Sequence, residues 1–135
     1  HRVDHLRRLR NIQDETGGFT GFIPFAFEPD GARPVLKGIP HATAYEELHN
    51  LAVSRIYLDN FPHIQASWFS EGKKTGQIAL HFGADDFGGT LFEENVHAAT
   101  DFINTTSVED IATLIRESGF QPAQRPTLYE IIRNW

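Results

Sequence analysis

The sequence predicts an α/β fold, the C-terminal half of a (β/α)8 TIM-like barrel with three parallel strands alternating with helices. Helical and extended patterns follow one another in alternation, which implies parallel strands joined by right-handed crossovers. No repeat, linker or low-complexity tract divides the chain, so we expect a single domain over residues 1–135. Three strands cannot close a barrel, and a complete barrel takes about 250 residues, so the domain is expected to be the incomplete second half.

The first predicted unit is a helix followed by a buried strand. Apolar side chains recur on one side of residues 2–14 at helical spacing, and Gly17 and Gly18 then suit a C-terminal cap. Residues 19–27 are an almost continuous apolar run, which is typical of a strand buried on both faces. Pro24 cannot donate a hydrogen bond to a neighbouring strand, a defect that is tolerated near a strand's end.

The middle of the chain repeats this order after a loop that is rich in proline and glycine, residues 28–40. Residues 42–58 carry an apolar stripe with a 3.6-residue period and predict a helix. Residues 64–69 predict a short strand of mixed polarity. Residues 75–82 predict a short helix.

The last part of the chain starts with a short predicted strand, residues 84–87, which runs into a Gly-rich and acid-rich loop. Residues 94–102 predict a helix. Ser107 and Asp110 have the spacing of a capping box and predict the start of another helix. The same spacing recurs between Thr127 and Glu130 and predicts a final helix over residues 128–135.

Composition narrows the possible functions. The net charge of −6 and a pI near 5.6 argue against a nucleic-acid-binding surface. No apolar run approaches the roughly 20 residues that a membrane span requires, and no signal peptide is visible, so we expect a cytoplasmic protein. Cysteine is absent, which excludes disulfides and thiolate-bound metals within this chain. Methionine is absent even at position 1, so we expect the chain to be trimmed or incompletely recorded.

Candidate chemistry gathers where the three predicted strands end, because α/β barrels build their sites at the carboxyl ends of the strands. These ends are residues 27–30, 67–71 and 85–90, and they offer carboxylates, hydroxyls and the indole of Trp68. The pattern contains no nucleophile elbow, phosphate loop or dinucleotide fingerprint. Trp68 is either a core residue or a platform on which a ligand stacks.

Paired carboxylates could perform general acid–base chemistry. Asp85 and Asp86 are adjacent, so only one of them can point into a barrel interior while the other faces the helix layer. Glu93 and Glu94 complete this pool of acids. Glu93 and His97 share a helical face, which leaves a metal hydrolase as an alternative, but no His-Glu-x-x-His motif is present and we assign no metal ligand.

Arg125 stands between a glutamine and a proline near the C-terminus. It either caps the preceding turn or uses its planar guanidinium to clamp a carboxylate or a phosphate.

Several ordered blocks resemble the C-terminal half of radical S-adenosylmethionine enzymes. Among these enzymes, the chain most resembles cyclic dehypoxanthine futalosine synthase of menaquinone biosynthesis. Aminofutalosine synthase and the F420 synthase subunit share the same blocks. Ser-Arg-Ile-Tyr and Gln-Ala-Ser-Trp favour the cyclase, whereas Ala-Asp-Asp favours aminofutalosine synthase. The blocks are residues 13–24, 51–62, 64–68, 82–90, 93–96 and 121–125, followed by 127–129.

The resemblance implies that this chain forms one wall of a chamber for S-adenosylmethionine and a nucleoside-like substrate, in an enzyme that cyclises dehypoxanthine futalosine. In that family a [4Fe-4S] cluster on three cysteines generates the radical. This chain has no cysteine, so it cannot bind the cluster and is expected to be inactive alone. No catalytic residue is assigned. The resemblance carries substrate or cofactor contact to Glu28, Ser67, Trp68, Asp86, Thr90 and Glu94.

Two further expectations follow from an incomplete barrel. An open sheet would expose an apolar edge at Phe19, Ile23 and Phe25, so we expect either self-association or pairing with a missing N-terminal half. The alternative function is a cluster-free half-barrel binding module without catalytic activity.

Overall fold

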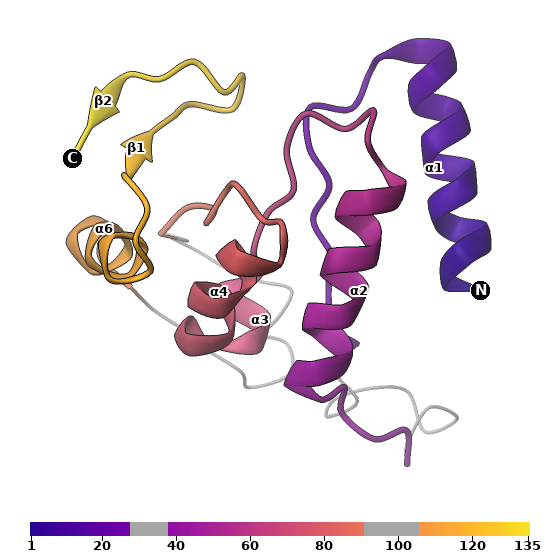
Figure 1. Ribbon diagram of the computed structural model, residues 1–135, viewed down its shortest axis with the longest axis horizontal. Coiled ribbons are helices and arrows are strands. Elements are labelled where there is room, and N and C mark those ends of the chain that lie inside the picture. The colour runs from indigo at the N-terminus through magenta and orange to yellow at the C-terminus, as the bar shows by residue number, and fades with distance from the viewer. Residues whose placement is uncertain (28–37, 91–105) are drawn as a thin grey trace.

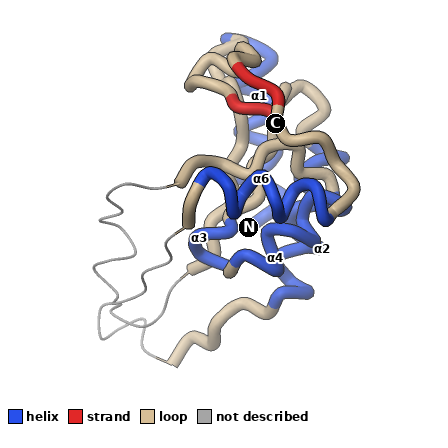
Figure 2. Tube along the Cα trace, turned by 90° about the vertical axis from the view of Figure 1, so that its left-hand side faces the viewer, coloured by secondary structure: helices blue, strands red, loops and turns tan. Residues whose placement is uncertain are grey.

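Helices dominate the part of the chain that the computed structural model describes, which is residues 1–27, 38–90 and 106–135 (Figures 1 and 2). The elements in chain order are α1 (Arg2–Thr16), α2 (Ala44–Tyr57), α3 (Trp68–Glu71), α4 (Lys73–Ala79), η2 (Leu80–Phe82), α6 (Val108–Glu117), β1 (Ala123–Gln124) and β2 (Arg133–Asn134). Within these residues no helix combines the length and the apolar character needed to cross a membrane. The predicted helix over 94–102 lies outside the described residues.

Three extended segments lie side by side and run in the same direction. Parallel bridges join Phe22 to Ile64 and Gln65 to Asp86. The N–H of Gln65 donates to the carbonyl of Phe22 at 2.9 Å, and the N–H of Ala66 donates to the carbonyl of Asp86 at 2.7 Å. Because the bridges are isolated, a barrel built on these segments stays a prediction. The segments, called first, second and third below, comprise residues 19–27, 63–67 and 84–90.

The first two helices confirm their predictions. Helix α1 ends at Gly17, whose φ of 58° is left-handed and whose N–H donates to the carbonyl of Gln13. Helix α2 begins after Thr43, which forms a capping box with Glu46. Both helices run in the same direction in Figure 1. The predicted start of the later helix is also correct, because Ser107 and Asp110 form a capping box at the N-terminus of α6.

The second segment is shorter than predicted, because Trp68 begins α3 instead of ending a strand. The backbone turns at Ser67, whose carbonyl accepts the N–H groups of Ser70 and Glu71, both at 3.1 Å. Residues 68 and 69 therefore leave the sheet and place the Trp68 and Phe69 side chains in the core.

The predicted final helix over residues 128–135 is wrong. The described chain forms an antiparallel hairpin there, with Ala123 opposite Asn134 and Gln124 opposite Arg133 (Figure 2). Tyr129 adopts a left-handed φ of 65°, which no helix continues. Contacts of its side chain with distant residues, described below, account for a conformation that local spacing does not predict.

Two apolar clusters hold these elements together. The larger one joins α2, the second and third segments, α3 and α4, and the smaller one joins α1 to the C-terminal end of α2. The buried members of the larger cluster are Leu51, Ile64, Ala66, Trp68, Phe69, Ala79, Ala84 and Phe87, and those of the smaller one are Leu6, Leu58 and Phe61. Burial of these side chains is the main favourable contribution to folding.

Candidate functional site

A cavity of about 640 Å³ lies at the carboxyl end of the first segment. Residues 22–27 form one wall and are mostly apolar and aromatic. Polar lining residues include Arg2 and His5 from the first turn of α1, and Glu47 and Asn50 from α2. The volume falls within the range of about 300–1,000 Å³ that small-molecule sites occupy. An aromatic wall facing a few polar groups suits a ligand that has both a flat apolar part and hydrogen-bonding groups.

Ser67 fixes the wall of this cavity. Its side chain is buried, with 1 % of its surface exposed, and its Oγ donates to the carbonyl of Pro24, which lines the cavity. The hydroxyl therefore ties the end of the second segment to the first. This contact positions the wall without placing the hydroxyl itself among the lining residues.

Trp68, the neighbour of Ser67, is fully buried. Its ring packs edge-on against Phe69, with the ring centroids 6.2 Å apart. Its indole Nε1–H has no hydrogen-bond partner among the described residues, which is unusual for a buried donor. In this structure Trp68 is a core residue, and its contact with substrate stays a prediction.

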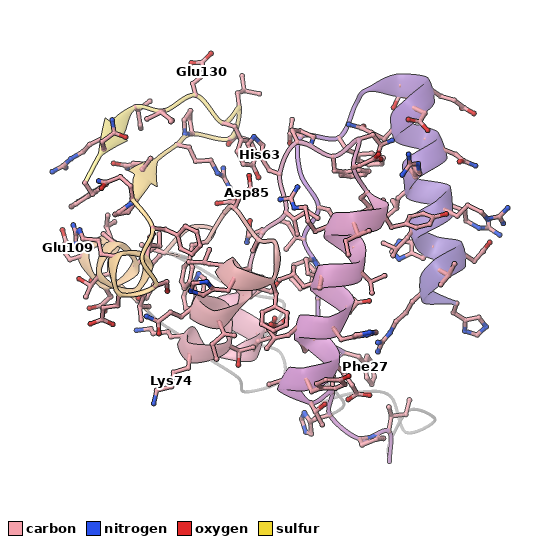
Figure 3. All side chains as sticks on the ribbon, in the orientation of Figure 1. Phe27, His63, Lys74, Asp85, Glu109 and Glu130 are labelled. Atoms are coloured by element: carbon pink, nitrogen blue, oxygen red, sulfur yellow. The ribbon has the colours of Figure 1, made fainter. Side chains whose placement is uncertain are left out.

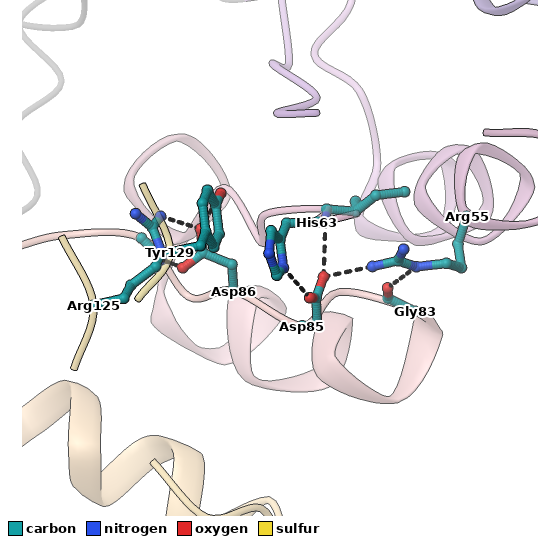
Figure 4. A network of polar contacts seen from close by, with 9 residues as sticks. Arg55, His63, Gly83, Asp85, Asp86, Arg125 and Tyr129 are labelled. Atoms are coloured by element: carbon teal, nitrogen blue, oxygen red, sulfur yellow. Dashed lines mark hydrogen bonds and ion pairs between the residues drawn. The ribbon is translucent and has the colours of Figure 1, made fainter. Parts of the chain in front are cut away.

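Asp85 and Asp86 diverge to two sets of partners, as expected for neighbours on an extended segment (Figure 4). Asp85 Oδ1 accepts hydrogen bonds from Nη2 of Arg55 at 2.5 Å and from the N–H of Ile64 at 2.8 Å. Asp85 Oδ2 lies 2.6 Å from Nδ1 of His63. The first carboxylate therefore faces the last turn of α2.

Asp86 is buried, with 9 % of its surface exposed, and its side chain contacts the C-terminal hairpin. Its Oδ2 forms an ion pair with Arg125 and accepts a hydrogen bond from the hydroxyl of Tyr129 at 2.9 Å. Its Oδ1 accepts the N–H of Gly88 at 3.0 Å. Arg125 thus clamps a carboxylate, one of its two predicted roles, and that carboxylate belongs to this chain.

Tyr129 is stacked between two other side chains. Its ring lies parallel to that of His63 with the centroids 3.7 Å apart, and the guanidinium carbon of Arg125 lies 3.8 Å from the ring centroid on the tyrosine. Burial, together with the charge of Asp86 and the hydrogen bond to it, raises the pKa of Tyr129 to about 12. This stack and the bonds to Asp86 join three distant parts of the sequence.

The cavity and the contacts of Asp85 and Asp86 lie at opposite ends of the three extended segments. His63 and Asp85 lie in the upper half of Figure 3, whereas Phe27, at the carboxyl end of the first segment, lies in the lower half. The structure therefore brings Ser67 next to the cavity wall and places Asp86 in a separate network that holds the hairpin. Thr90 is half-buried at the end of the third segment.

The remaining predicted contacts, Glu28 and Glu94, lie outside the described residues, as do Glu93 and His97 of the alternative metal hydrolase. Among the residues that are described, no group of three or more His, Asp or Glu side chains could hold a metal ion.

The sequence pattern missed the polar side of the cavity. Arg2, His5 and Glu47 lie on two predicted helices that are distant in the sequence, and only the packing of those helices on residues 22–27 brings them together. Glu46 and Glu47 both line the cavity and suit the helix dipole in the first turn of α2, but that local signal predicts the helix and not the cavity.

A cavity at the carboxyl end of parallel extended segments is typical of ligand-binding α/β proteins. Comparison with known families is consistent with a ligand-binding α/β protein and identifies a particular family. The chain belongs to the family described as CofH/MqnC C-terminal region, whose model matches residues 16–135.

Relatives of this chain carry the names of synthases and transferases. The chain is 46 % identical to cyclic dehypoxanthine futalosine synthase of Streptomyces coelicolor, with 96 % of this chain and 32 % of the relative covered. It is 44 % identical to aminodeoxyfutalosine synthase of the same organism, with 100 % and 38 % covered. It is 42 % identical to a 5-amino-6-(D-ribitylamino)uracil–L-tyrosine 4-hydroxyphenyl transferase of Methanopyrus kandleri, with 97 % and 37 % covered.

These matches confirm the family resemblance. The chain spans about a third of the length of these relatives. All three are named for a synthase or transferase reaction, so the alternative of a binding module without catalytic activity is not favoured.

Proposed function

We propose that this chain is the C-terminal part of a radical S-adenosylmethionine enzyme of the futalosine route to menaquinone, with dehypoxanthine futalosine as the substrate. The observation that carries the proposal is the match of residues 16–135 to the family's C-terminal region. The cyclase is chosen because the sequence blocks resemble it and a cyclase relative is 46 % identical, while a synthase relative is 44 % identical. The two values are close, so the experiment below includes both substrates.

The radical chemistry belongs to a part of the enzyme other than these residues. A [4Fe-4S] cluster in such enzymes is held by thiolates, and this chain has no cysteine, so its residues do not fit that group. The contribution of the chain is a wall of the chamber in which S-adenosylmethionine and the nucleoside-like substrate meet. Residues 22–27, held in place by Ser67, are the described part of that wall. Contact of Glu28, Trp68, Asp86, Thr90 and Glu94 with substrate or cofactor remains part of this proposal.

The partner of this chain is proposed to be the N-terminal half of the same barrel. The first segment bonds to the second on one side, and it leaves Ile23, Phe25 and Phe27 with 39 %, 58 % and 46 % of their surfaces exposed. Phe19 differs, because its ring stacks on Phe61 with the centroids 5.3 Å apart. An exposed apolar segment next to a chamber suits completion by further strands. The span of about a third of the relatives' length supports this partner over a second copy.

The test is an anaerobic assay of the complete polypeptide that contains this chain, with its cluster reconstituted and S-adenosylmethionine added. We expect dehypoxanthine futalosine to trigger formation of 5′-deoxyadenosine and to be converted to its cyclic product. Turnover of the aminodeoxyfutalosine synthase substrate instead would move the assignment to that enzyme. Failure of both substrates with a loaded cluster would overturn the proposal.

A further inference from the structure

The C-terminal hairpin contacts all three extended segments near the ends that lie opposite the cavity. The ring of Tyr129 stacks on His63, the first residue of the second segment, and its hydroxyl donates a hydrogen bond to Asp86 of the third. The same hydroxyl lies against the first segment, because a Cβ built at Gly21 would be 2.7 Å from it. One side chain of the hairpin therefore touches each of the three segments.

These contacts involve the face of the segments that turns away from α2. Asp85 and Asp86 are neighbours on the third segment, so their side chains point to opposite faces. Asp85 bonds to Arg55 of α2, which shows that a helix covers its face. Asp86 lies on the other face and binds Arg125 and Tyr129 (Figure 4). In the proposed barrel this second face is the interior, so the hairpin reaches into the amino-terminal end of the barrel.

The loop that carries Tyr129 also presents three large aliphatic side chains to solvent. Leu128, Ile131 and Ile132 leave 74 %, 67 % and 61 % of their surfaces exposed. The loop itself is anchored, through the stack of Tyr129 and through the N–H of Ile132, which donates to the carbonyl of Gln124 at 2.9 Å. Single exposed aliphatic residues are ordinary, but three that gather on one anchored loop are typical of a contact surface.

We propose that Leu128, Ile131 and Ile132 form a docking surface for the N-terminal half of the same polypeptide, a partner whose identity rests on the proposed function. The hairpin then closes the amino-terminal end of the barrel. Its Arg125 and Tyr129 hold the C-terminal half, and its aliphatic residues hold the N-terminal half.

The share of the relatives that this chain covers favours this occupant. The chain matches a C-terminal region and spans 32 % and 38 % of the two Streptomyces coelicolor relatives, so most of such a polypeptide lies outside these residues. A docking surface of this chain can therefore be covered within one molecule.

The order of the segments favours the same occupant. Parallel bridges from Phe22 to Ile64 and from Gln65 to Asp86 place the second segment in the middle and leave the first and third at the edges. Strands that complete the barrel would continue from these edges, and their amino-terminal ends would surround the hairpin from the other side. A second copy of the chain would have to occupy the place of those strands.

The first test measures burial of the surface in the complete polypeptide that contains this chain. Hydroxyl-radical footprinting compares the oxidation rate of Ile131 in the native state with its rate in the urea-unfolded state. We expect native Ile131 to react about ten times more slowly, because only local opening would expose it. Ile56 on α2, with 80 % of its surface exposed, is the matched control of the same residue type and is expected to react at nearly its unfolded rate. A native Ile131 that reacts as fast as the unfolded one would overturn the proposal.

The second test identifies what covers the surface. Photoreactive benzoylphenylalanine in place of Leu128 is expected to cross-link, within one molecule, to peptides that precede this chain in the complete polypeptide. The same group in place of Ile56 is the control and is expected to give no such cross-link. Cross-links between two molecules would assign the surface to a second copy, and cross-links confined to residues 1–135 would leave the N-terminal half without contact; either result would overturn the proposal.

Neither measurement needs substrate or S-adenosylmethionine, so the docking surface and the proposed reaction can fail separately. Turnover of dehypoxanthine futalosine without protection of Ile131 would overturn the docking surface alone. Protection and intramolecular cross-links in a polypeptide that converts neither substrate would support the docking surface and overturn the proposed reaction alone.

Discussion

The guanidinium of Arg125 and the carboxylate of Asp86, 39 residues apart in the sequence, form an ion pair that ties the C-terminal hairpin to the third segment (Figure 4). Only 9 % of the Asp86 side chain and 25 % of the Arg125 side chain remain exposed. A carboxylate in such surroundings depends on its partner, because an unpaired buried charge is strongly unfavourable. The hairpin therefore has a structural function that its own two short strands do not reveal.

Replacing Arg125 with methionine is expected to lower the free energy of unfolding by about 2 kcal/mol or more, since Asp86 would then be buried without its cation. Urea denaturation measures the loss. Arg133→Met is the control, because Arg133 lies on the exposed strand β2 of the same hairpin. Adding Asp86→Asn to Arg125→Met should recover part of the loss, because the uncompensated charge is removed. A double variant less stable than either single one would contradict this account.

The hydroxyl of Tyr129 is expected to make stability depend on pH in the alkaline range. Its pKa is raised to about 12 in the folded chain from an ordinary value near 10, so the folded state keeps a proton that the unfolded state loses in this window. The stability that this group contributes should be complete below pH 10 and decline as the pH rises to about 12. Absorbance at 295 nm should show a late-ionising tyrosine that is missing in Tyr129→Phe.

The same variant separates the hydroxyl from the ring. Tyr129→Phe retains the stack on His63 and loses one hydrogen bond to a charged acceptor, so it should cost about 1–2 kcal/mol. Tyr129→Ala loses both and should cost more. Equal costs for the two variants would show that the ring contributes nothing.

Elements with local signals were predictable from the sequence. Gly17 ends α1 as expected, and the spacing of Ser107 and Asp110 locates the start of α6. The same spacing between Thr127 and Glu130 gave a wrong helix. There the backbone of Tyr129 adopts a left-handed conformation, and its hydroxyl donates a hydrogen bond to Asp86, 43 positions earlier.

The candidate site was predictable only in outline. The ends of the extended segments pointed to Ser67, which does support the cavity wall. The direction in which each Asp side chain points depends on how helices and the C-terminal hairpin pack on distant segments. Periodicity shows which face of a helix is apolar, but it does not show what that face meets.

Gly76 allows a test of the packing between α3 and α4. A Cβ built at this position would lie 2.6 Å from Cβ of Trp68, a distance that real atoms do not tolerate. Gly76→Ala should therefore destabilise the chain by about 1–3 kcal/mol, although alanine favours helices. Gly89→Ala, where a Cβ meets nothing within 4 Å, is the control for thermal melts. Stabilisation by Gly76→Ala would show that α4 lies further from Trp68 than described.

Ser67→Ala tests whether the hydroxyl positions the chamber wall. The variant loses the bond to the carbonyl of Pro24 and leaves that buried acceptor unpaired, which should cost about 1–3 kcal/mol of stability. Since Pro24 lines the cavity while Ser67 acts from behind it, the complete enzyme should show a raised KM with a much smaller change in kcat. Ser70→Ala is the matched control, because the Ser70 hydroxyl bonds to the carbonyl of Ser67 and does not reach the first segment. A kcat that falls a hundredfold in Ser67→Ala with KM unchanged would instead place the hydroxyl at the reacting atoms.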